Sequence, residues 1–281
     1  MDYMARALHL AARALGRSSP NPAVGAVLVK DGRVVGEGST QPPGQAHAEV
    51  VALTQAGLEA HGATMYVTLE PCPHHGRTPP CVDAIVAAGV ADVQIATIDP
   101  SPWVSGAGRA ALARAGVRTT VGLFETEARR LNEGYIHWVE RGRPLVTALW
   151  AMSLGGLVAG PPQKGLGVAA RTEWERLRSR ADRVSDGLAA FPSDEHSLLS
   201  LGKIGVTSLL VECSPADLPL VLAADVLDKV VIFLTPHLGG APLARPTDPF
   251  ASIVPLRRLE FERLGDDLMV VGYTRACSPA S

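Results

Sequence analysis

Hydrophobic positions in the first half of the chain alternate between helical and strand spacing. Apolar residues three and four positions apart predict a helix over residues 3–15, and two short apolar runs joined by Asp31-Gly32 predict a β-hairpin over residues 24–38. Helices and strands then alternate as far as Gly142. The helices are expected at 47–60, 81–89, 109–116 and 125–142, and the strands at 63–69, 92–98 and 117–122. This order is typical of an α/β sheet covered by helices.

The pattern is less regular after Gly142, where Arg143-Pro144 opens a new strand-like run over residues 144–153. A Gly/Pro-rich loop and further short elements follow this run. The loop is expected at 155–167, helices at 171–182, 196–205 and 215–224, strands at 208–212 and 229–236, and a closing hairpin at 256–275. We therefore predict two domains, residues 1–143 and residues 144–281.

Candidate metal chemistry lies between His47 and Cys81. The imidazole of His47 and the thiols of Cys72 and Cys81 are the N and S donors that zinc prefers, and a catalytic zinc keeps three protein ligands and one open position. Glu49, two residues after His47, is left free to move protons. H-x-E followed by P-C and a second Cys is the signature of zinc deaminases, which normally have two residues between the cysteines; here Pro73 to Pro80 separate them.

Each of these residues alone would have an ordinary structural explanation. A free cysteine is often a small buried hydrophobe, a histidine can cap or pack, and a glutamate can be solvated. The joint pattern, with H-x-E opening one expected helix and the second cysteine opening another, favours the metal site. The sequence therefore predicts a zinc-dependent hydrolytic deaminase.

Four stretches resemble the bifunctional riboflavin-biosynthesis deaminase/reductase family: PNPAVGAVLVKDG, HAEVVAL, TLEPCPHHGRTPPC and DPSPWVSGAG. The resemblance covers roughly residues 1–143 and implies a cytidine-deaminase-like three-layer domain. It also implies the substrate, the pyrimidine ribotide 2,5-diamino-6-(5-phospho-ribosylamino)pyrimidin-4-one, which would lose its ring amino group as ammonia. His47, Cys72 and Cys81 match the zinc ligands of the family, and Glu49 matches its proton shuttle.

The resemblance also implies a set of substrate contacts. The matching positions are Asn21, His74, Arg77 and Asp99. Asn21 could instead be a turn residue, and His74 and Arg77 could belong to the structure of the loop between the cysteines. Two departures concern this region, because Thr40 and Ser101 stand where the family usually has histidine and asparagine.

From Arg143 onward the chain resembles the dihydrofolate-reductase-like α/β domain of the same family, but shortened and degenerate. Leu149 stands where a lysine is usual, Gly155 where an aspartate is usual, and the family's V-E-G-G is replaced by residues 211–214, Val-Glu-Cys-Ser. Glycines near a dinucleotide let the backbone approach its phosphates, so we expect NADPH binding and reductase activity to be lost, leaving no nucleotide cofactor. The retained apolar strands favour a scaffold role and a homo-oligomer, a dimer or a tetramer.

Composition and charge limit the partners. A length of 281 residues suits two domains, and the net charge of −2 gives no support for a basic nucleic-acid-binding face. We expect a small-molecule substrate, no nucleic acid and no membrane partner. The N-terminal segment has no signal-peptide pattern, and the cysteines not assigned to metal form no disulfide framework, so we expect a cytoplasmic protein.

Three alternatives stay open at this point. The chain could retain both deaminase and NADPH-reductase activities. It could deaminate a related pyrimidine or purine, which the departures at Thr40 and Ser101 motivate. It could also be a non-catalytic assembly partner, although the complete set of three ligands and Glu49 argues against that interpretation.

Overall fold

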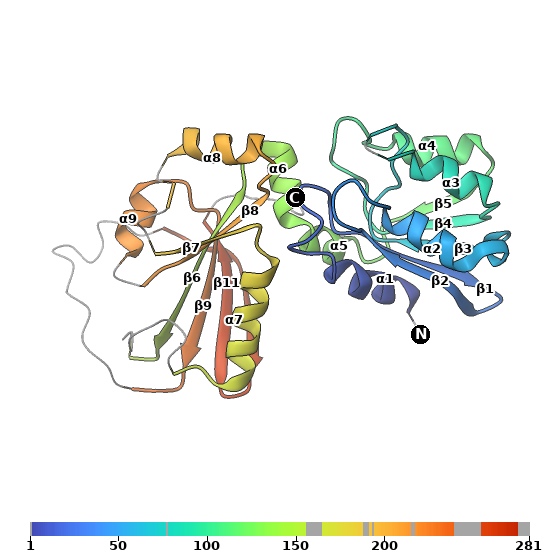
Figure 1. Cartoon of the computed structure of the whole chain (residues 1–281). Coiled ribbons are helices and arrows are strands. Elements are labelled where there is room, and N and C mark those ends of the chain that lie inside the picture. The colour runs from blue at the N-terminus through green and yellow to red at the C-terminus, as the bar shows by residue number, and fades with distance from the viewer. Residues whose placement is uncertain are drawn as a thin grey trace. The chain divides into compact units, whose positions relative to one another are not determined.

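The computed structural model describes residues 2–76, 78–155, 165–187, 191–192, 194–214, 217–238 and 254–274. The chain divides into two compact units that meet in sequence between Glu140 and Arg141 (Figure 1). Each unit has one β-sheet, and each is described here by itself.

The first unit is built on a five-stranded sheet with the order β2-β1-β3-β4-β5. Strand β1 pairs antiparallel with β2 and β3, whereas β3, β4 and β5 are parallel. The strands are β1 (Gly25–Lys30), β2 (Arg33–Ser39), β3 (Thr64–Val67), β4 (Asp92–Ile95) and β5 (Arg118–Val121). The helices are α1 (Tyr3–Ala12), α2 (Ala48–Ala56), α3 (Cys81–Ala87), α4 (Ala107–Arg114), α5 (Glu125–Leu131) and α6 (Glu133–Arg141), with a 3-10 turn, η1 (Gly57–Ala60), after α2.

The side chains of β1 point alternately to the two faces of the sheet, and each face packs into its own hydrophobic cluster. Ala26 and Leu28 face a cluster that includes residues of α2, α3 and α4, whereas Val27 and Val29 face a cluster with α1 and α5 (Figure 1). Successive side chains of a strand point to opposite faces, so one short strand supports both layers. Helices therefore cover both faces of the sheet, as the predicted three-layer fold requires.

Two glycines of β2 let helix α2 lie directly on the sheet. A Cβ at Gly38 would lie 2.2 Å from the carbonyl oxygen of Ala48, and one at Gly36 would lie 2.2 Å from that of Ala52. Glycine inside a strand commonly marks such a close approach of two backbones. This contact fixes the start of α2, where the candidate ligand His47 is the N-cap residue.

The single helix predicted over residues 125–142 is wrong, because Asn132 separates α5 from α6. The Asn132 side chain is buried and makes hydrogen bonds to both the N–H and the carbonyl of Ala23. Its Oδ1 accepts the Ala23 N–H at 2.8 Å, and its Nδ2 donates to the Ala23 carbonyl at 2.9 Å. Helical periodicity alone does not reveal this break, because the partner lies 109 residues away in sequence.

The second unit has a six-stranded sheet with the order β10-β11-β9-β6-β8-β7. Strands β7, β8, β6 and β9 are parallel, and β11 runs antiparallel to β9 and β10. The strands are β6 (Leu145–Ser153), β7 (Arg183–Asp186), β8 (Ser208–Glu212), β9 (Lys229–Thr235), β10 (Arg257–Leu264) and β11 (Asp267–Tyr273). The helices are α7 (Val168–Arg180), α8 (Glu195–Lys203) and α9 (Leu218–Ala223).

Two clusters form the core of this unit. Helix α7 contributes Ala170 and the fully buried Trp174 to one cluster, and Leu198 of α8 and Val221 of α9 belong to the other. Strand β7 was missed in the sequence analysis: it is short, and three of its four residues are half-buried or exposed. It carries too little apolar alternation to give a strand signal.

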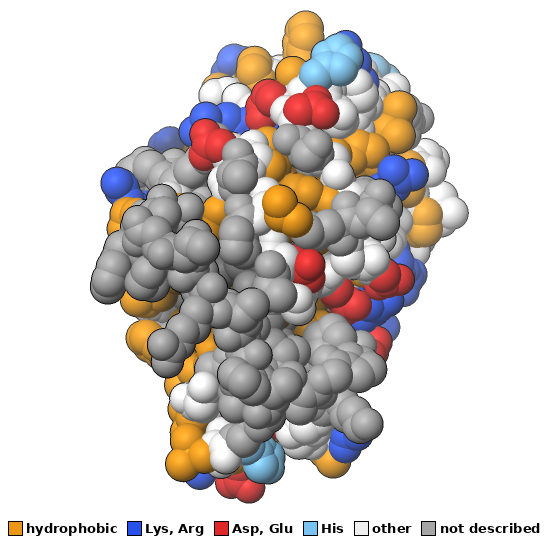
Figure 2. Space-filling view, turned by 90° about the vertical axis from the view of Figure 1, so that its left-hand side faces the viewer, with side chains coloured by type: hydrophobic (Ala, Val, Ile, Leu, Met, Phe, Trp, Pro, Cys, Tyr) orange, Lys and Arg blue, Asp and Glu red, His pale blue; other side chains and the backbone are white. Residues whose placement is uncertain are grey.

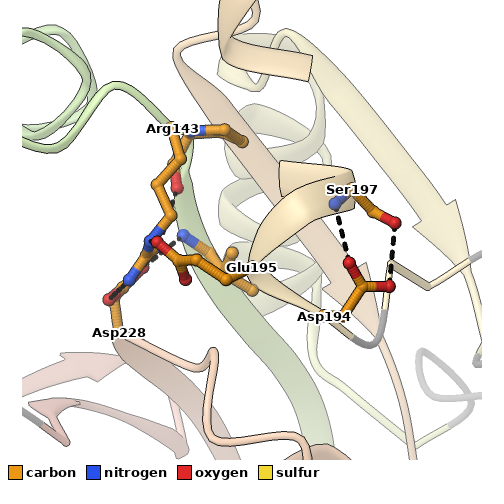
Figure 3. A network of polar contacts seen from close by, with 7 residues as sticks. Arg143, Asp194, Glu195, Ser197 and Asp228 are labelled. Carbon is orange, nitrogen blue, oxygen red and sulfur yellow. Dashed lines mark hydrogen bonds and ion pairs between the residues drawn. The ribbon is translucent and has the colours of Figure 1, made fainter. Parts of the chain in front are cut away.

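A buried ion pair joins the start of β6 to the segment before β9 (Figure 3). Arg143 donates to both carboxylate oxygens of Asp228, at 2.6 and 2.9 Å, and its Nε lies 3.0 Å from Glu195 at the start of α8. The Arg143 and Asp228 side chains are 3% and 0% exposed. Asp228 also accepts the Val146 N–H at 3.0 Å, so the two charges are held by directed bonds in the interior.

Acidic and basic side chains both occur on the face of the molecule that Figure 2 shows. Figure 2 shows basic and acidic side chains interspersed with hydrophobic ones over the described part of that face. This agrees with a chain that has 26 basic and 28 acidic residues. Among the described residues, the helices are all too short or too polar to span a bilayer.

Candidate active site and metal centre

Three ligand-type side chains meet beyond the carboxyl end of β3, the central strand of the first unit's sheet. His47 is the N-cap of α2, Cys72 follows β3, and Cys81 is the first residue of α3. One donor atom from each lies within 4.8 Å of the other two. The His47 Nδ1 lies 3.3 Å from the Cys81 Sγ and 3.7 Å from the Cys72 Sγ.

The donor set fits zinc. One imidazole nitrogen and two thiol sulfurs, brought together from three elements, are the ligands of a three-coordinate protein site that leaves one position open. The Cys81 N–H, at the start of α3, points at the Cys72 Sγ at 3.4 Å. A hydrogen bond from the Cys81 thiol holds the pKa of Cys72 well below its usual range, which favours the thiolate form that binds metal.

Glu49 lies beside this cluster on the first turn of α2 and is only 4% exposed. Burial, followed by the negative charge of Cys72, raises the pKa of Glu49 to about 7. A carboxyl group whose pKa lies near neutrality can both accept and return a proton. Glu49 and His47 are two residues apart, so they would not share a face within a helix. Both line the same cavity because His47 is the N-cap residue, where the backbone is still extended.

The cavity has a volume of about 160 Å³ and contains most of the residues predicted as the site. Of the predicted substrate contacts, Asn21, His74 and Asp99 line it. Arg77 lies outside the described residues. Six further residues line the cavity although no sequence pattern predicted them as site residues: Pro22, Val24, Leu69, Glu70, Val104 and Tyr135.

Tyr135 comes from α6 and pairs with Asp99 across the cavity wall. Its hydroxyl donates to Asp99 at 3.1 Å, and the Ser101 N–H donates to the same carboxylate at 2.8 Å. Burial raises the pKa of Asp99 to about 6, and burial with the Asp99 charge also raises the pKa of Tyr135. No local motif marks Tyr135, because it reaches the cavity only through tertiary packing.

Thr40 and Ser101, the two departures from the family pattern, both line the cavity. The Thr40 hydroxyl accepts the Val24 N–H at 3.0 Å, and the Thr40 N–H donates to the Val24 carbonyl at 2.9 Å. Thr40 therefore ties the end of β2 to the start of β1 and places a short side chain at the cavity wall.

Known proteins match the chain over both units. Residues 1–97 match the family described as the cytidine and deoxycytidylate deaminase zinc-binding region. The riboflavin biosynthesis protein RibD of Actinobacillus pleuropneumoniae is 35% identical over 254 residues, which is 88% of this chain and 68% of that protein. The chain belongs to the RibD family.

Other RibD-family members give the same result. RibD of Aquifex aeolicus is 51% identical over 158 residues, 56% of this chain, and RibD of Escherichia coli is 45% identical over 199 residues, 70% of this chain. These alignments cover 44% and 54% of the two relatives, so the chain spans about half of the length of these relatives.

Two solved structures match the fold at a TM-score of 0.80 and 28% identity, and each match covers 96% of this chain and 97% of the other. One is RibD of Acinetobacter baumannii. The other, from Thermotoga maritima, is described as a diaminohydroxyphosphoribosylaminopyrimidine deaminase/5-amino-6-(5-phosphoribosylamino)uracil reductase. The predicted family and the predicted fold class, a cytidine-deaminase-like domain followed by a reductase-like domain, are confirmed.

In the second unit, Leu149, Cys213 and Ser214, which were expected to depart from the family pattern, make hydrogen bonds within the unit. Leu149 is fully buried, and its carbonyl accepts the Cys213 N–H at 3.0 Å. The Ser214 N–H and hydroxyl both bond the carboxylate of Asp217 at 2.8 Å. The Ser214 N–H, two residues after the end of β8, is therefore bonded to an acidic side chain of the same unit.

Glu212, the remaining acid of this motif, is also engaged within the unit. It accepts a hydrogen bond from the Trp174 Nε1 at 2.7 Å and pairs with Arg178. Both partners lie on α7, so the carboxyl end of β8 is bound to that helix.

Proposed function

We propose that this chain is a zinc-dependent hydrolytic deaminase of riboflavin biosynthesis, with residues 1–143 as its deaminase domain. The proposed substrate is the small pyrimidine ribotide 2,5-diamino-6-(5-phospho-ribosylamino)pyrimidin-4-one, whose ring amino group leaves as ammonia. The observation that carries the proposal is the cluster of His47, Cys72 and Cys81, of which His47 and Cys72 line one cavity together with the buried carboxyl of Glu49. Membership of the RibD family supports it.

In this proposal, His47, Cys72 and Cys81 hold the metal. Zinc, when bound, would act as a Lewis acid that makes water a nucleophile near neutral pH. Glu49 takes a proton from the attacking water at a carboxylate oxygen and returns it to the nitrogen of the departing amino group. Water thus supplies the carbonyl oxygen of the uracil-type product, and the amino group leaves as ammonia.

Asn21, His74 and Asp99 are proposed to bind the pyrimidine ribotide, and their position on the cavity wall supports this role. Arg77 is proposed as a further contact from the family pattern alone. Because the cavity is small and is formed within one unit, it suits a small molecule better than a nucleic acid.

We also propose that residues 144–281 form a degenerate reductase-like domain without NADPH turnover. Leu149 is buried in the sheet, and the backbone N–H of Ser214 already has the Asp217 carboxylate as acceptor. An incoming phosphate would have to displace that carboxylate and would meet its negative charge. The retained core fits a scaffold of a homo-oligomer, a dimer or a tetramer.

A second candidate function is deamination of a related pyrimidine or purine. It is favoured by Thr40, which lines the cavity where the family usually has a histidine. A smaller side chain at this position changes both the shape and the charge of the wall that would face the sugar phosphate.

The test is ammonia release from the diaminopyrimidine ribotide by the wild-type chain and by Glu49→Gln at equal zinc content. We expect rapid release by the wild type and a loss of at least about 100-fold in the variant, the usual contribution of a positioned acid–base group. Equal rates would refute the role of Glu49. Release only from another amine would support the second candidate, and NADPH oxidation with the deaminated product would refute the loss of reductase activity.

A further inference from the structure

The segment from Asp99 to Gly106, which leads from β4 into α4, forms one wall of the cavity. Three of its residues, Asp99, Ser101 and Val104, line the cavity directly. A loop of this kind keeps its shape only if its backbone N–H groups find fixed acceptors. The carboxylate of Glu70, which follows β3 and precedes the candidate ligand Cys72 by two residues, supplies the acceptors at both ends of this segment.

Glu70 accepts backbone hydrogen bonds at both ends of this segment. Its Oε2 accepts the Asp99 N–H at 3.3 Å and the Gly106 N–H at 2.9 Å, and its Oε1 accepts the Arg109 N–H at 2.9 Å. The residue is only 3% exposed. Gly106, the N-cap of α4, has no side chain to bond the free N–H groups of the helix, so the remote carboxylate takes that place.

Packing also brings α4 against the segment that leads to Cys72. A Cβ at Gly108 would lie 2.0 Å from the Pro71 carbonyl oxygen and 3.2 Å from the Glu70 Cγ. The first turn of α4 therefore lies directly on the backbone of Pro71 and against the side chain of Glu70. This arrangement fixes the loop relative to the candidate metal centre, since both are attached to the same short segment.

A purely structural explanation is that Glu70 caps one helix and no more. That explanation accounts for the bonds to Gly106 and Arg109 but not for the bond to Asp99, a cavity residue at the other end of the loop. We propose that Glu70 is a positioning residue for substrate binding: its buried carboxylate holds the loop 99–106 in the shape that forms the cavity wall. This inference rests on the proposed deaminase function.

The proposal makes a distinction that kinetics can measure. Loop residues that contact substrate in both the ground state and the transition state contribute uniform binding, so loss of their position raises KM and leaves kcat nearly unchanged. For Glu70→Ala we expect KM for the diaminopyrimidine ribotide to rise at least about tenfold, with kcat within about threefold. Amide hydrogen exchange should accelerate in residues 99–109 while zinc content stays equal to that of the wild type.

Two further variants keep the test valid if Glu70→Ala fails to fold. Glu70→Gln keeps one acceptor oxygen and should show a smaller rise of KM in the same direction. Gly108→Ala leaves the carboxylate intact but forces α4 away from Pro71, so it should accelerate exchange in the same segment and raise KM. The matched control is Asp182→Asn in the second unit, because Asp182 also accepts backbone bonds, from the Thr207 and Ser208 N–H groups at 2.7 and 3.2 Å.

The outcomes separate this inference from the proposed function. If the wild type releases no ammonia from the ribotide, the proposed function fails, and the substrate-binding role of Glu70 fails with it. If the wild type is active but the Glu70 and Gly108 variants keep wild-type KM and wild-type exchange over 99–109, only the role of Glu70 is overturned. Loss of zinc from these variants, or KM changes no larger than that of Asp182→Asn, would also overturn it.

Discussion

Replacement of Arg143 by methionine should strongly destabilise the second unit. The guanidinium makes two hydrogen bonds to Asp228, at 2.6 and 2.9 Å, and the two side chains are 3% and 0% exposed (Figure 3). Methionine fills much of the same volume but carries no charge, so the buried Asp228 carboxylate would lose its ion pair with Arg143.

The magnitude follows from this geometry. Removing one partner of a buried ion pair costs about 3–5 kcal/mol, chiefly because the other charge is left uncompensated. The contact of Arg143 with Glu195 adds little, since the Glu195 side chain is 55% exposed and such pairs contribute about 0–1 kcal/mol. The double variant Arg143→Met/Asp228→Asn should recover at least half of the loss, because the uncompensated charge is gone.

Urea unfolding followed by tryptophan fluorescence measures this effect. Trp150 and Trp174 are both buried in the second unit, so their emission reports its unfolding. We expect the unfolding free energy of Arg143→Met to fall by about 3–5 kcal/mol and that of Glu195→Gln by less than about 1 kcal/mol. A fall below about 1 kcal/mol for Arg143→Met, or no recovery in the double variant, would refute the reasoning.

Three further substitutions test the first unit. Gly38→Ala places a Cβ 2.2 Å from the Ala48 carbonyl oxygen, so it should shift α2, lower Tm and reduce the zinc content. An unchanged zinc content would contradict the idea that contact with β2 positions His47 at the start of α2. Asn132→Ala leaves the Asn132 hydrogen bonds to the buried Ala23 N–H and carbonyl unmade and should cost about 2–4 kcal/mol in urea unfolding; a loss below about 1 kcal/mol would contradict this role. Burial raises the pKa of Asp99 from 3.8 to about 6. The unfolding free energy of the wild type, measured relative to that of Asp99→Asn, should therefore be greatest below about pH 4 and should fall as the pH rises through about 6. A difference that does not change with pH would exclude this titration.

The sequence identified the chemistry because that chemistry needs few residue types at fixed spacing. His47, Glu49 and Cys81 lie at the starts of helices and Cys72 in the segment after a strand, and the structure brings His47, Cys72 and Cys81 together beside the cavity that Glu49 lines. Such side chains are recognisable before folding because the zinc site restricts both their identity and their order. The alternation of helices and strands likewise predicted the layered α/β architecture.

Residues whose role depends on distant backbone partners could not be predicted. Glu70 acts on N–H groups 29 to 39 residues away, and Asn132 breaks a helix to bond Ala23, 109 residues away. Tyr135 reaches the cavity from a helix that local periodicity extends without interruption. In each case, tertiary hydrogen bonding decides the conformation, and no local pattern encodes it.

The central claim is that His47, Cys72 and Cys81 hold a zinc ion required for deamination. The most direct test is elemental analysis of the purified full chain and of Cys81→Ser, combined with ammonia release by the same samples. We expect one zinc per wild-type chain, with both metal and ammonia release lost in the variant. A metal-free wild-type chain that still releases ammonia from the ribotide would contradict the account.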